Sequence, residues 1–74
     1  MKALAPVPML YVNDAPTPVP REATVQGLAR ALGFDGRKGV AVALNGVVVP
    51  HLEWTSRGVA ADDRVLIIQA TQGG

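Results

Sequence analysis

One short helix constrains the fold of this chain more than any other feature. Its apolar residues follow the i, i+3, i+4, i+7 spacing of a single helical stripe: Val25, Leu28, Ala29 and Leu32. Thr24 precedes the stripe at the position of an N-cap. Because about two turns of helix are unstable alone, this stripe must be buried against other elements.

The sequence also predicts where this helix ends. Gly33 stands where a left-handed C′ residue is expected, and Phe34 can fold back onto the helix. The helix residues outside the stripe should face away from the core: Gln26, Arg30 and Ala31.

The segment before the helix predicts two strands joined by a turn. Residues 9–13 are rich in β-prone side chains, and residues 13–15 form a turn sequence. Residues 17–21 can return as a second strand. Pro18 and Pro20 cannot donate to a ladder, so this segment must be an edge strand or irregular.

A hairpin follows the helix. Residues 40–44 alternate large and small side chains, which suits a strand with its large side chains toward the core. Asn45-Gly46 is the strongest short hairpin signal. Residues 47–49 form the returning strand, and Pro50 ends it.

The last third of the chain predicts a short turn and a final strand. Residues 51–54 read as a turn or 3₁₀ segment in which Leu52 and Trp54 cap the core. Residues 61–63 form another turn, and residues 64–70 form the last strand.

The predicted order is strand, strand, helix, strand, strand, strand. A mixed sheet of four to five strands wrapped around one main helix is the compact way to bury the helical stripe. This is an α+β fold, the β-grasp or ubiquitin-like arrangement. We expect residues 1–8 to form a flexible leader, residues 9–70 the β-grasp domain and residues 71–74 a flexible tail.

Composition excludes several classes of function. The chain has no cysteine, so it has no thiol nucleophile, thiolate metal site or disulfide. A net charge of +1 with three scattered aromatic residues argues against nucleic acid as a partner. No apolar run is long enough to span a membrane, and prolines interrupt the N-terminal segment where a signal sequence would be apolar. We expect a cytoplasmic protein.

The side chains do not form a catalytic constellation. His51 is the only histidine, lacks the companions that a general base or metal site needs, and should lie on the surface. Asp62 and Asp63 look like paired carboxylates but should cap a turn. The Arg37-Lys38 pair should lie in a solvated loop. We therefore expect a protein that is not an enzyme.

The chain ends in a short polar tail with two glycines: Thr71, Gln72, Gly73 and Gly74. Glycines make the thinnest and most pliable end, which can thread a narrow channel. The Gly74 carboxylate is ionised at neutral pH and becomes an acceptor only after activation, for example by ATP as an acyl-adenylate. A sulfur nucleophile can then displace AMP and leave a thiocarboxylate. The alternative is an inert, frayed chain end.

The final strand predicts a second functional surface. Val65 and Ile67 should point to the core, whereas Leu66, Ile68 and Ala70 should point to the opposite face. One helix covers only one face, so apolar residues on the other face indicate a partner surface. Two alternatives remain open: ordinary surface hydrophobes on a central strand, or packing by the N-terminal leader.

Over roughly residues 9–74, the sequence resembles the ThiS family of sulfur carriers in thiamine biosynthesis. Four segments carry the resemblance: Thr24-Val25 with Leu28, Val42-Ala43-Leu44-Asn45-Gly46 with Val49-Pro50-His51 and Trp54, Asp63-Arg64-Val65, and Gln69-Ala70 with Gly73-Gly74. The Asn45, Val49-Pro50 and Trp54 block is the specific part, since related molybdopterin carriers lack it. The chain departs from many members at His51, where arginine is common, at Asp62, where glycine is common, and in the extra residues 1–8.

The resemblance implies a mechanism and partners. Gly74 matches the residue that is adenylated and then converted to a thiocarboxylate, and Gly73 matches the flexible penultimate residue. A ThiF-like adenylating enzyme would use ATP and magnesium, so this chain would bind no cofactor itself. A cysteine desulfurase or similar donor would supply the sulfur, and a ThiG-like thiazole synthase would receive it.

Three other functions stay open at this point. The carrier could serve molybdopterin synthesis or tRNA thiolation instead of thiazole synthesis. It could be a ubiquitin-like modifier whose Gly74 forms an isopeptide bond to lysine. It could also be a β-grasp interaction module with an inert tail.

Overall fold

The structure, a computed structural model, describes residues 7–70 of the 74-residue chain. Most of the expected leader and the whole expected tail therefore lie outside the described residues. The described elements follow the predicted order: β1 Met9–Val12, β2 Ala15–Pro18, α1 Val25–Ala31, β3 Val40–Leu44, β4 Val47–Val49, the 3₁₀ turn η1 His51–Glu53, and β5 Arg64–Gln69.

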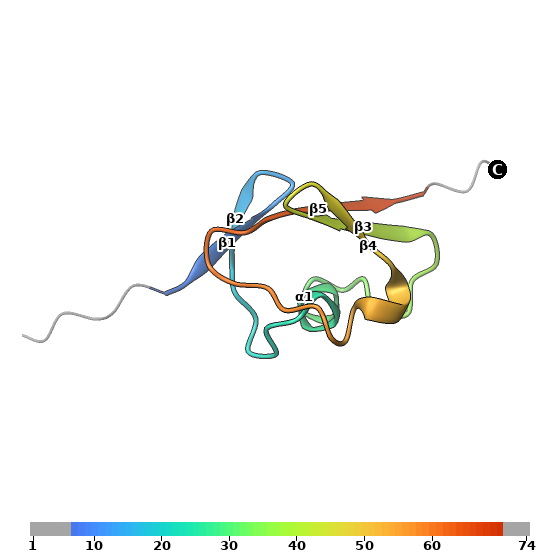
Figure 1. The fold of residues 1–74 in the computed structure, drawn as a ribbon, viewed down its shortest axis with the longest axis horizontal. Coiled ribbons are helices and arrows are strands. Elements are labelled where there is room, and N and C mark those ends of the chain that lie inside the picture. Colours follow the sequence, from blue (N-terminus) through green and yellow to red (C-terminus); the bar gives the residue numbers. More distant parts are fainter. Residues whose placement is uncertain (1–6, 71–74) are drawn as a thin grey trace, which may run out of the picture.

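The strands form one five-stranded sheet in the order β2-β1-β5-β3-β4, so β5 is the central strand. The β1–β5 pair is parallel and the other pairs are antiparallel, which makes the sheet mixed. Helix α1 and η1 lie on one side of the sheet, and no helix of the described residues covers the other side (Figure 1). This is the predicted α+β, β-grasp arrangement with all five strands in one sheet.

Two tight turns set the register of the hairpins. Asn13 and Asp14 have φ of 50° and 69°, and Asn45 and Gly46 have φ of 49° and 84°. Positive φ at both central residues is the type I′ pattern that matches the twist of paired strands. The first turn leads directly into β2 at Ala15, so the predicted second strand at residues 17–21 had the wrong bounds. Its predicted place at the sheet edge is confirmed.

Helix α1 begins at the predicted cap. The Thr24 hydroxyl oxygen accepts a hydrogen bond from the Gly27 N–H at 3.0 Å. This bond satisfies one of the backbone donors that the first turn leaves free. Val25, Leu28 and Ala29 are buried, as the stripe predicted.

The helix ends in a Schellman motif. The Phe34 N–H donates to the Ala29 carbonyl at 2.8 Å, and the Gly33 N–H donates to the Arg30 carbonyl at 3.2 Å. Gly33 has φ of 84°, and Phe34 packs against the core, both as predicted. Leu32 was expected in the core but is 38% exposed. It is the C-cap, with non-helical φ and ψ of −93° and 0°, so its side chain leaves the stripe.

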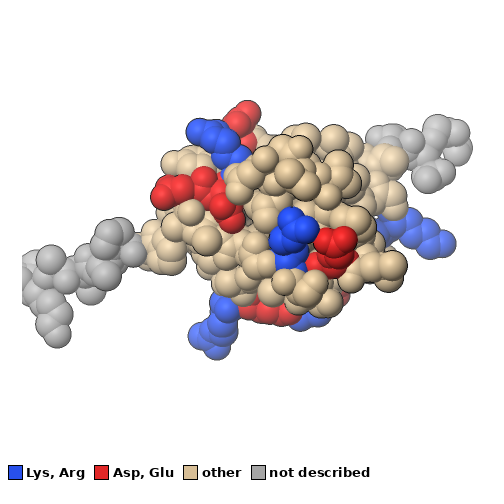
Figure 2. All heavy atoms as spheres, in the orientation of Figure 1, with Lys and Arg blue, Asp and Glu red and all other residues tan. Residues whose placement is uncertain are grey.

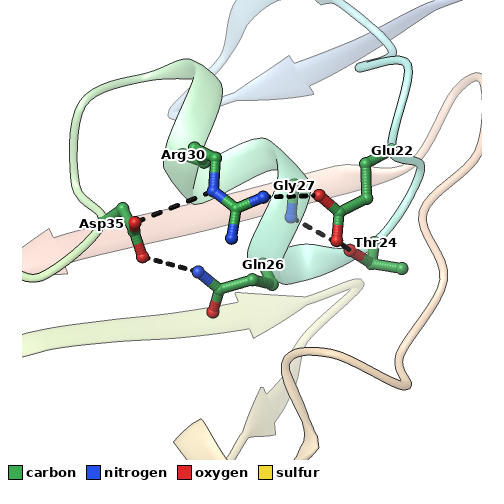
Figure 3. Close-up of polar contacts among 6 residues, drawn as sticks. All are labelled: Glu22, Thr24, Gln26, Gly27, Arg30 and Asp35. Carbon is green, nitrogen blue, oxygen red and sulfur yellow. Dashed lines mark hydrogen bonds and ion pairs between the residues drawn. The ribbon is translucent and has the colours of Figure 1, made fainter.

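Exposed polar residues tie both ends of α1 to the flanking loops (Figure 3). The Arg30 guanidinium lies 2.9 Å from the Glu22 carboxylate and 3.7 Å from the Asp35 carboxylate. Gln26 Nε2 donates to Asp35 Oδ1 at 2.6 Å. These contacts turn the Asp35 carboxylate toward the helix.

The core lies between α1 and the inner face of the sheet. Trp54 closes it beside β4, and its indole N–H donates to the Val49 carbonyl at 3.0 Å. Leu52 was also predicted to cap the core, but it is 93% exposed. In a 3₁₀ turn residues i and i+3 align, so His51 rather than Leu52 lies beside Trp54, with ring centroids 4.6 Å apart.

Candidate functional site

Alternate residues of β5 face opposite sides of the sheet. Val65 and Ile67 are 3% and 5% exposed in the core, as predicted. Leu66 and Ile68 are 49% and 55% exposed on the opposite side. Ala70, which follows β5, is also exposed. The predicted division of this strand into a core side and a solvent side is confirmed.

The register extends this apolar surface across β3 and β4. Ala43 pairs with Leu66 on one side and with Val48 on the other, and Ala41 pairs with Ile68. Directly paired residues of antiparallel strands share a face. We call this surface the outer apolar face; it consists of Ala41, Ala43, Val48, Leu66 and Ile68.

Sequence reasoning placed only the β5 residues on this face. Val48, which is 70% exposed, and the two alanines were missed. The alternation of large and small residues in 40–44, combined with the register set by the Asn45-Gly46 turn, was the signal that could have found them.

Near β1 the outer side of the sheet carries charged side chains beside an aromatic ring. The Arg64 guanidinium lies 5.4 Å from the centre of the Tyr11 ring and 3.9 Å from the Asp14 carboxylate. Tyr11 and Arg64 are neighbours in the parallel register of β1 and β5. This charged group thus lies at the first residue of β5, whereas Leu66 and Ile68 lie nearer to the C-terminal end of the strand.

Two residues outside β5 anchor its C-terminal part through hydrogen bonds, and we call them anchors. The Ala70 N–H donates to the Gly39 carbonyl at 2.8 Å, one residue beyond the strand itself. Gly39 has φ of 74°, and a Cβ there would lie 3.3 Å from the Cβ of Ala70. A glycine at this position thus permits both the left-handed backbone and the close approach of Ala70.

The second anchor is Asn13, which the sequence identified only as a turn residue. Its carboxamide oxygen accepts from the Ile67 N–H at 2.9 Å, and its Nδ2 donates to the Ile67 carbonyl at 3.1 Å. The side chain thus continues the pairing of β1 with β5 beyond Val12. Asn13 and Gly39 thus form hydrogen bonds with the backbone of Ile67 and Ala70, and these bonds fix the path of the chain as far as Ala70.

The tail residues of the predicted site lie outside the described residues: Thr71, Gln72, Gly73 and Gly74. Their assigned roles remain predictions. What the structure defines is the strand that leads to them.

The other polar candidates have structural surroundings. His51 is exposed, as expected. Asp63 accepts from the Ala60 N–H at 2.8 Å and from Asn45 Nδ2 at 3.1 Å, and Asp62 has φ of 71°, which confirms both as turn residues. Within residues 7–70 no group of three His, Cys, Asp or Glu side chains could hold a metal ion. No helix in this part of the chain is long and apolar enough to cross a membrane.

The fold and the site define a class of protein. It is a small β-grasp protein whose central strand has an apolar side that no element of residues 7–70 covers, and the sequence after Ala70 continues to Gly73-Gly74. The chain belongs to the ThiS family, whose model matches residues 9–74. The resemblance seen in the sequence is thereby confirmed.

A solved structure agrees with this assignment. The crystal structure of a thiamine biosynthesis protein (ThiS) from Geobacter metallireducens is similar to this chain, with 31% sequence identity and a TM-score of 0.73. The match covers 89% of this chain and 99% of that one. A search among curated proteins found no match. Family and structure together support a sulfur carrier of thiamine biosynthesis, which is not itself a catalyst.

Proposed function

We propose that this protein carries sulfur for thiazole synthesis as a thiocarboxylate on Gly74. The observation that carries the proposal is the central strand β5, anchored up to Ala70 and continuous with the diglycine end, in a chain of the ThiS family. A carrier of this kind is a cosubstrate: it presents one carboxylate and is regenerated after sulfur transfer.

The chemistry proceeds in three steps. A Gly74 carboxylate oxygen attacks the α-phosphorus of ATP, which releases pyrophosphate and forms an acyl-adenylate. A sulfide-equivalent nucleophile then attacks the acyl carbon, the C–O bond to AMP breaks, and AMP leaves with the electron pair. In the thiazole synthase complex the sulfur bonds to the acceptor, the C–S bond to Gly74 breaks, and an oxygen takes its place on the acyl carbon, which regenerates the carboxylate.

The carrier depends on other proteins for each step. The whole chain lacks cysteine, so the sulfur must come from another molecule. In this proposal a ThiF-like adenylating enzyme uses ATP and magnesium, and a donor such as a cysteine desulfurase supplies the sulfur. A ThiG-like synthase receives the sulfur.

We assign the docking of these partners to Leu66 and Ile68 of the outer apolar face and to Ala70, which directly follows β5. The exposure of all three residues supports this assignment. Ala41, Ala43 and Val48 extend the same surface. A partner that covers these side chains would remove their apolar surface from water. The covered surface would lie next to Ala70, the last described residue before the tail.

Intact mass spectrometry tests the chemistry. The full-length protein is incubated with ATP, magnesium, its cognate ThiF-like enzyme and a sulfur donor. The expected mass gain is that of one oxygen replaced by sulfur. A variant that lacks Gly74 should stay unmodified but keep the same thermal unfolding midpoint. The absence of any gain, in a system that modifies an established carrier, would contradict the proposal.

Growth rescue tests the pathway. Expression of the protein should restore a strain that needs thiazole because its own carrier is deleted, and the Gly74 deletion should not. Rescue of molybdoenzyme activity or tRNA thiolation, without rescue of thiazole synthesis, would assign the same chemistry to a different acceptor. Conjugates that survive reduction in denaturing gels would instead indicate a protein modifier.

A further inference from the structure

The charged side chains of the described surface divide into paired and unpaired groups. Three arginines form ion pairs within residues 7–70: Arg30 with Glu22 and Asp35, Arg57 with Glu53, and Arg64 with Asp14. Three other cations of this part of the chain form none: Arg21, Arg37 and Lys38. Two of these three are adjacent in sequence, so they concentrate charge at one place.

Arg37 and Lys38 lie beside the end of β5. They immediately precede Gly39, whose carbonyl accepts the Ala70 N–H. Figure 2 shows basic side chains that stand out at this end of the molecule, without acidic atoms next to them in that view. The pair therefore lies next to the position from which the C-terminal tail leaves the domain.

Within residues 7–70, Arg37 contacts Phe34 but forms no ion pair. Its backbone N–H donates to the Phe34 carbonyl at 3.1 Å, and its guanidinium lies 6.0 Å from the centre of the Phe34 ring. Phe34 itself packs on the core. Asp35 belongs to the same loop, but its carboxylate faces Gln26 and Arg30 on α1 (Figure 3). The nearest acidic residue in the sequence is thus already paired.

We propose that Arg37 and Lys38 dock on acidic side chains around the opening that receives the tail on the adenylating enzyme. This inference rests on the function proposed above and names the chemistry of that partner's surface. A partner with an apolar centre and an acidic border on one side would match the outer apolar face and the adjacent cations together. Complementary charge at the rim of an interface orients the encounter.

Chain length argues that the pair contacts this border and not the nucleotide. A tail threaded into a channel is drawn out, and residues 71–74 then span about 14 Å. In that case the Gly74 carboxylate would react at about this distance from Ala70. Arg37 and Lys38, in contrast, directly precede Gly39, which is hydrogen-bonded to Ala70 itself. The contact should therefore speed association and leave the chemical step unchanged.

Association kinetics with the purified adenylating enzyme test the proposal. The double variant R37E/K38E is compared with wild type and with the control variant R21E. Arg21 is exposed and forms no ion pair within residues 7–70, and it lies in the β2–α1 connection, away from the end of β5 (Figure 1). At low ionic strength we expect the double variant to bind about tenfold more slowly and to lose most of the salt dependence of the wild type. R21E should stay within about twofold of wild type. Turnover at saturating carrier should be unchanged in all three.

Three results would overturn this inference. The first is an unchanged association rate for R37E/K38E. The second is an equal loss for R21E, which would indicate net charge alone. The third is a raised KM for ATP at saturating carrier, which would place the pair at the nucleotide. A milder variant, R37Q/K38Q, should fall between wild type and the double reversal, and matching thermal midpoints would show that all variants are folded.

The association measurements and the intact-mass assay together separate the two proposals. If wild-type carrier gains no sulfur, the proposed function fails whatever the association rates are. If wild type is modified but the double variant associates as fast as wild type, only the proposed docking of Arg37 and Lys38 on acidic side chains is contradicted.

Discussion

The two sides of the central strand β5 differ in what covers them. Within residues 7–70, Val65 and Ile67 belong to a buried core of twelve residues that also includes Leu10, Leu28 and Trp54. Leu66 and Ile68 have similar apolar side chains but no covering layer within residues 7–70. The two sets alternate residue by residue and have similar strand propensity, so they differ in what packs on each side of the sheet.

This difference separates the residues that stabilise the fold from the residues that we propose for docking. Each buried aliphatic side chain stabilises the domain by about 1.5–3 kcal/mol relative to an exposed one. In a small domain with marginal stability, the inner side of β5 is therefore indispensable for folding. The outer side contributes little to folding and remains available to a partner. Because side chains alternate along a strand, β5 contributes both to the core and to the proposed docking surface.

The comparison is tested most strongly by the same substitution at adjacent residues. Ile67→Ala removes a side chain that is 5% exposed and should lower the free energy of unfolding by about 2–5 kcal/mol. Ile68→Ala removes one that is 55% exposed and should cost less than about 1 kcal/mol. Urea unfolding of both variants measures the difference. Equal losses would show that the outer side is as important to folding as the inner side.

The second test concerns the anchor that holds β5 beside β1. Asn13→Ala should cost about 1–3 kcal/mol, because both hydrogen bonds to Ile67 are lost and φ is positive at this position. Asp14→Ala is the matched control, since Asp14 also has positive φ but does not contact Ile67. A smaller loss of stability for Asp14→Ala, measured by thermal unfolding, would isolate the contribution of the two hydrogen bonds between Asn13 and Ile67. An equal loss would mean that turn geometry alone accounts for the effect.

The test with the smallest expected effect on stability asks how far the docking surface extends across the outer apolar face. Val48→Ala and Val47→Ala change neighbouring exposed residues of β4, and each should cost less than about 1 kcal/mol. Val48 shares the face of Leu66 through Ala43, whereas Val47 pairs with the buried Leu44. Val48→Ala should therefore slow association with the adenylating enzyme, and Val47→Ala should not. Identical rates for the two variants would restrict the docking face to β5.

Much of this architecture is determined by local sequence. The spacing of Val25, Leu28 and Ala29, with Thr24 before it and Gly33 after it, defines a helix and both of its ends. Each of these signals acts within a few residues, through side-chain periodicity or a hydrogen bond to the nearby backbone. The Asn45-Gly46 turn and the alternation along β5 act over the same short range. Fold class, element order and the two sides of β5 could therefore be predicted.

Tertiary structure decided the features that depend on distant partners. Asn13 clamps Ile67 across 54 positions of sequence, and Val48 joins the outer apolar face only through the register of β4, β3 and β5. Leu32 and Leu52 were expected in the core on periodicity and hydrophobicity but lie at positions where the chain turns away from it. The physical reason is the same in each case. Local signals determine which conformation a segment adopts, whereas burial and cross-strand contact depend on which other segments pack against it.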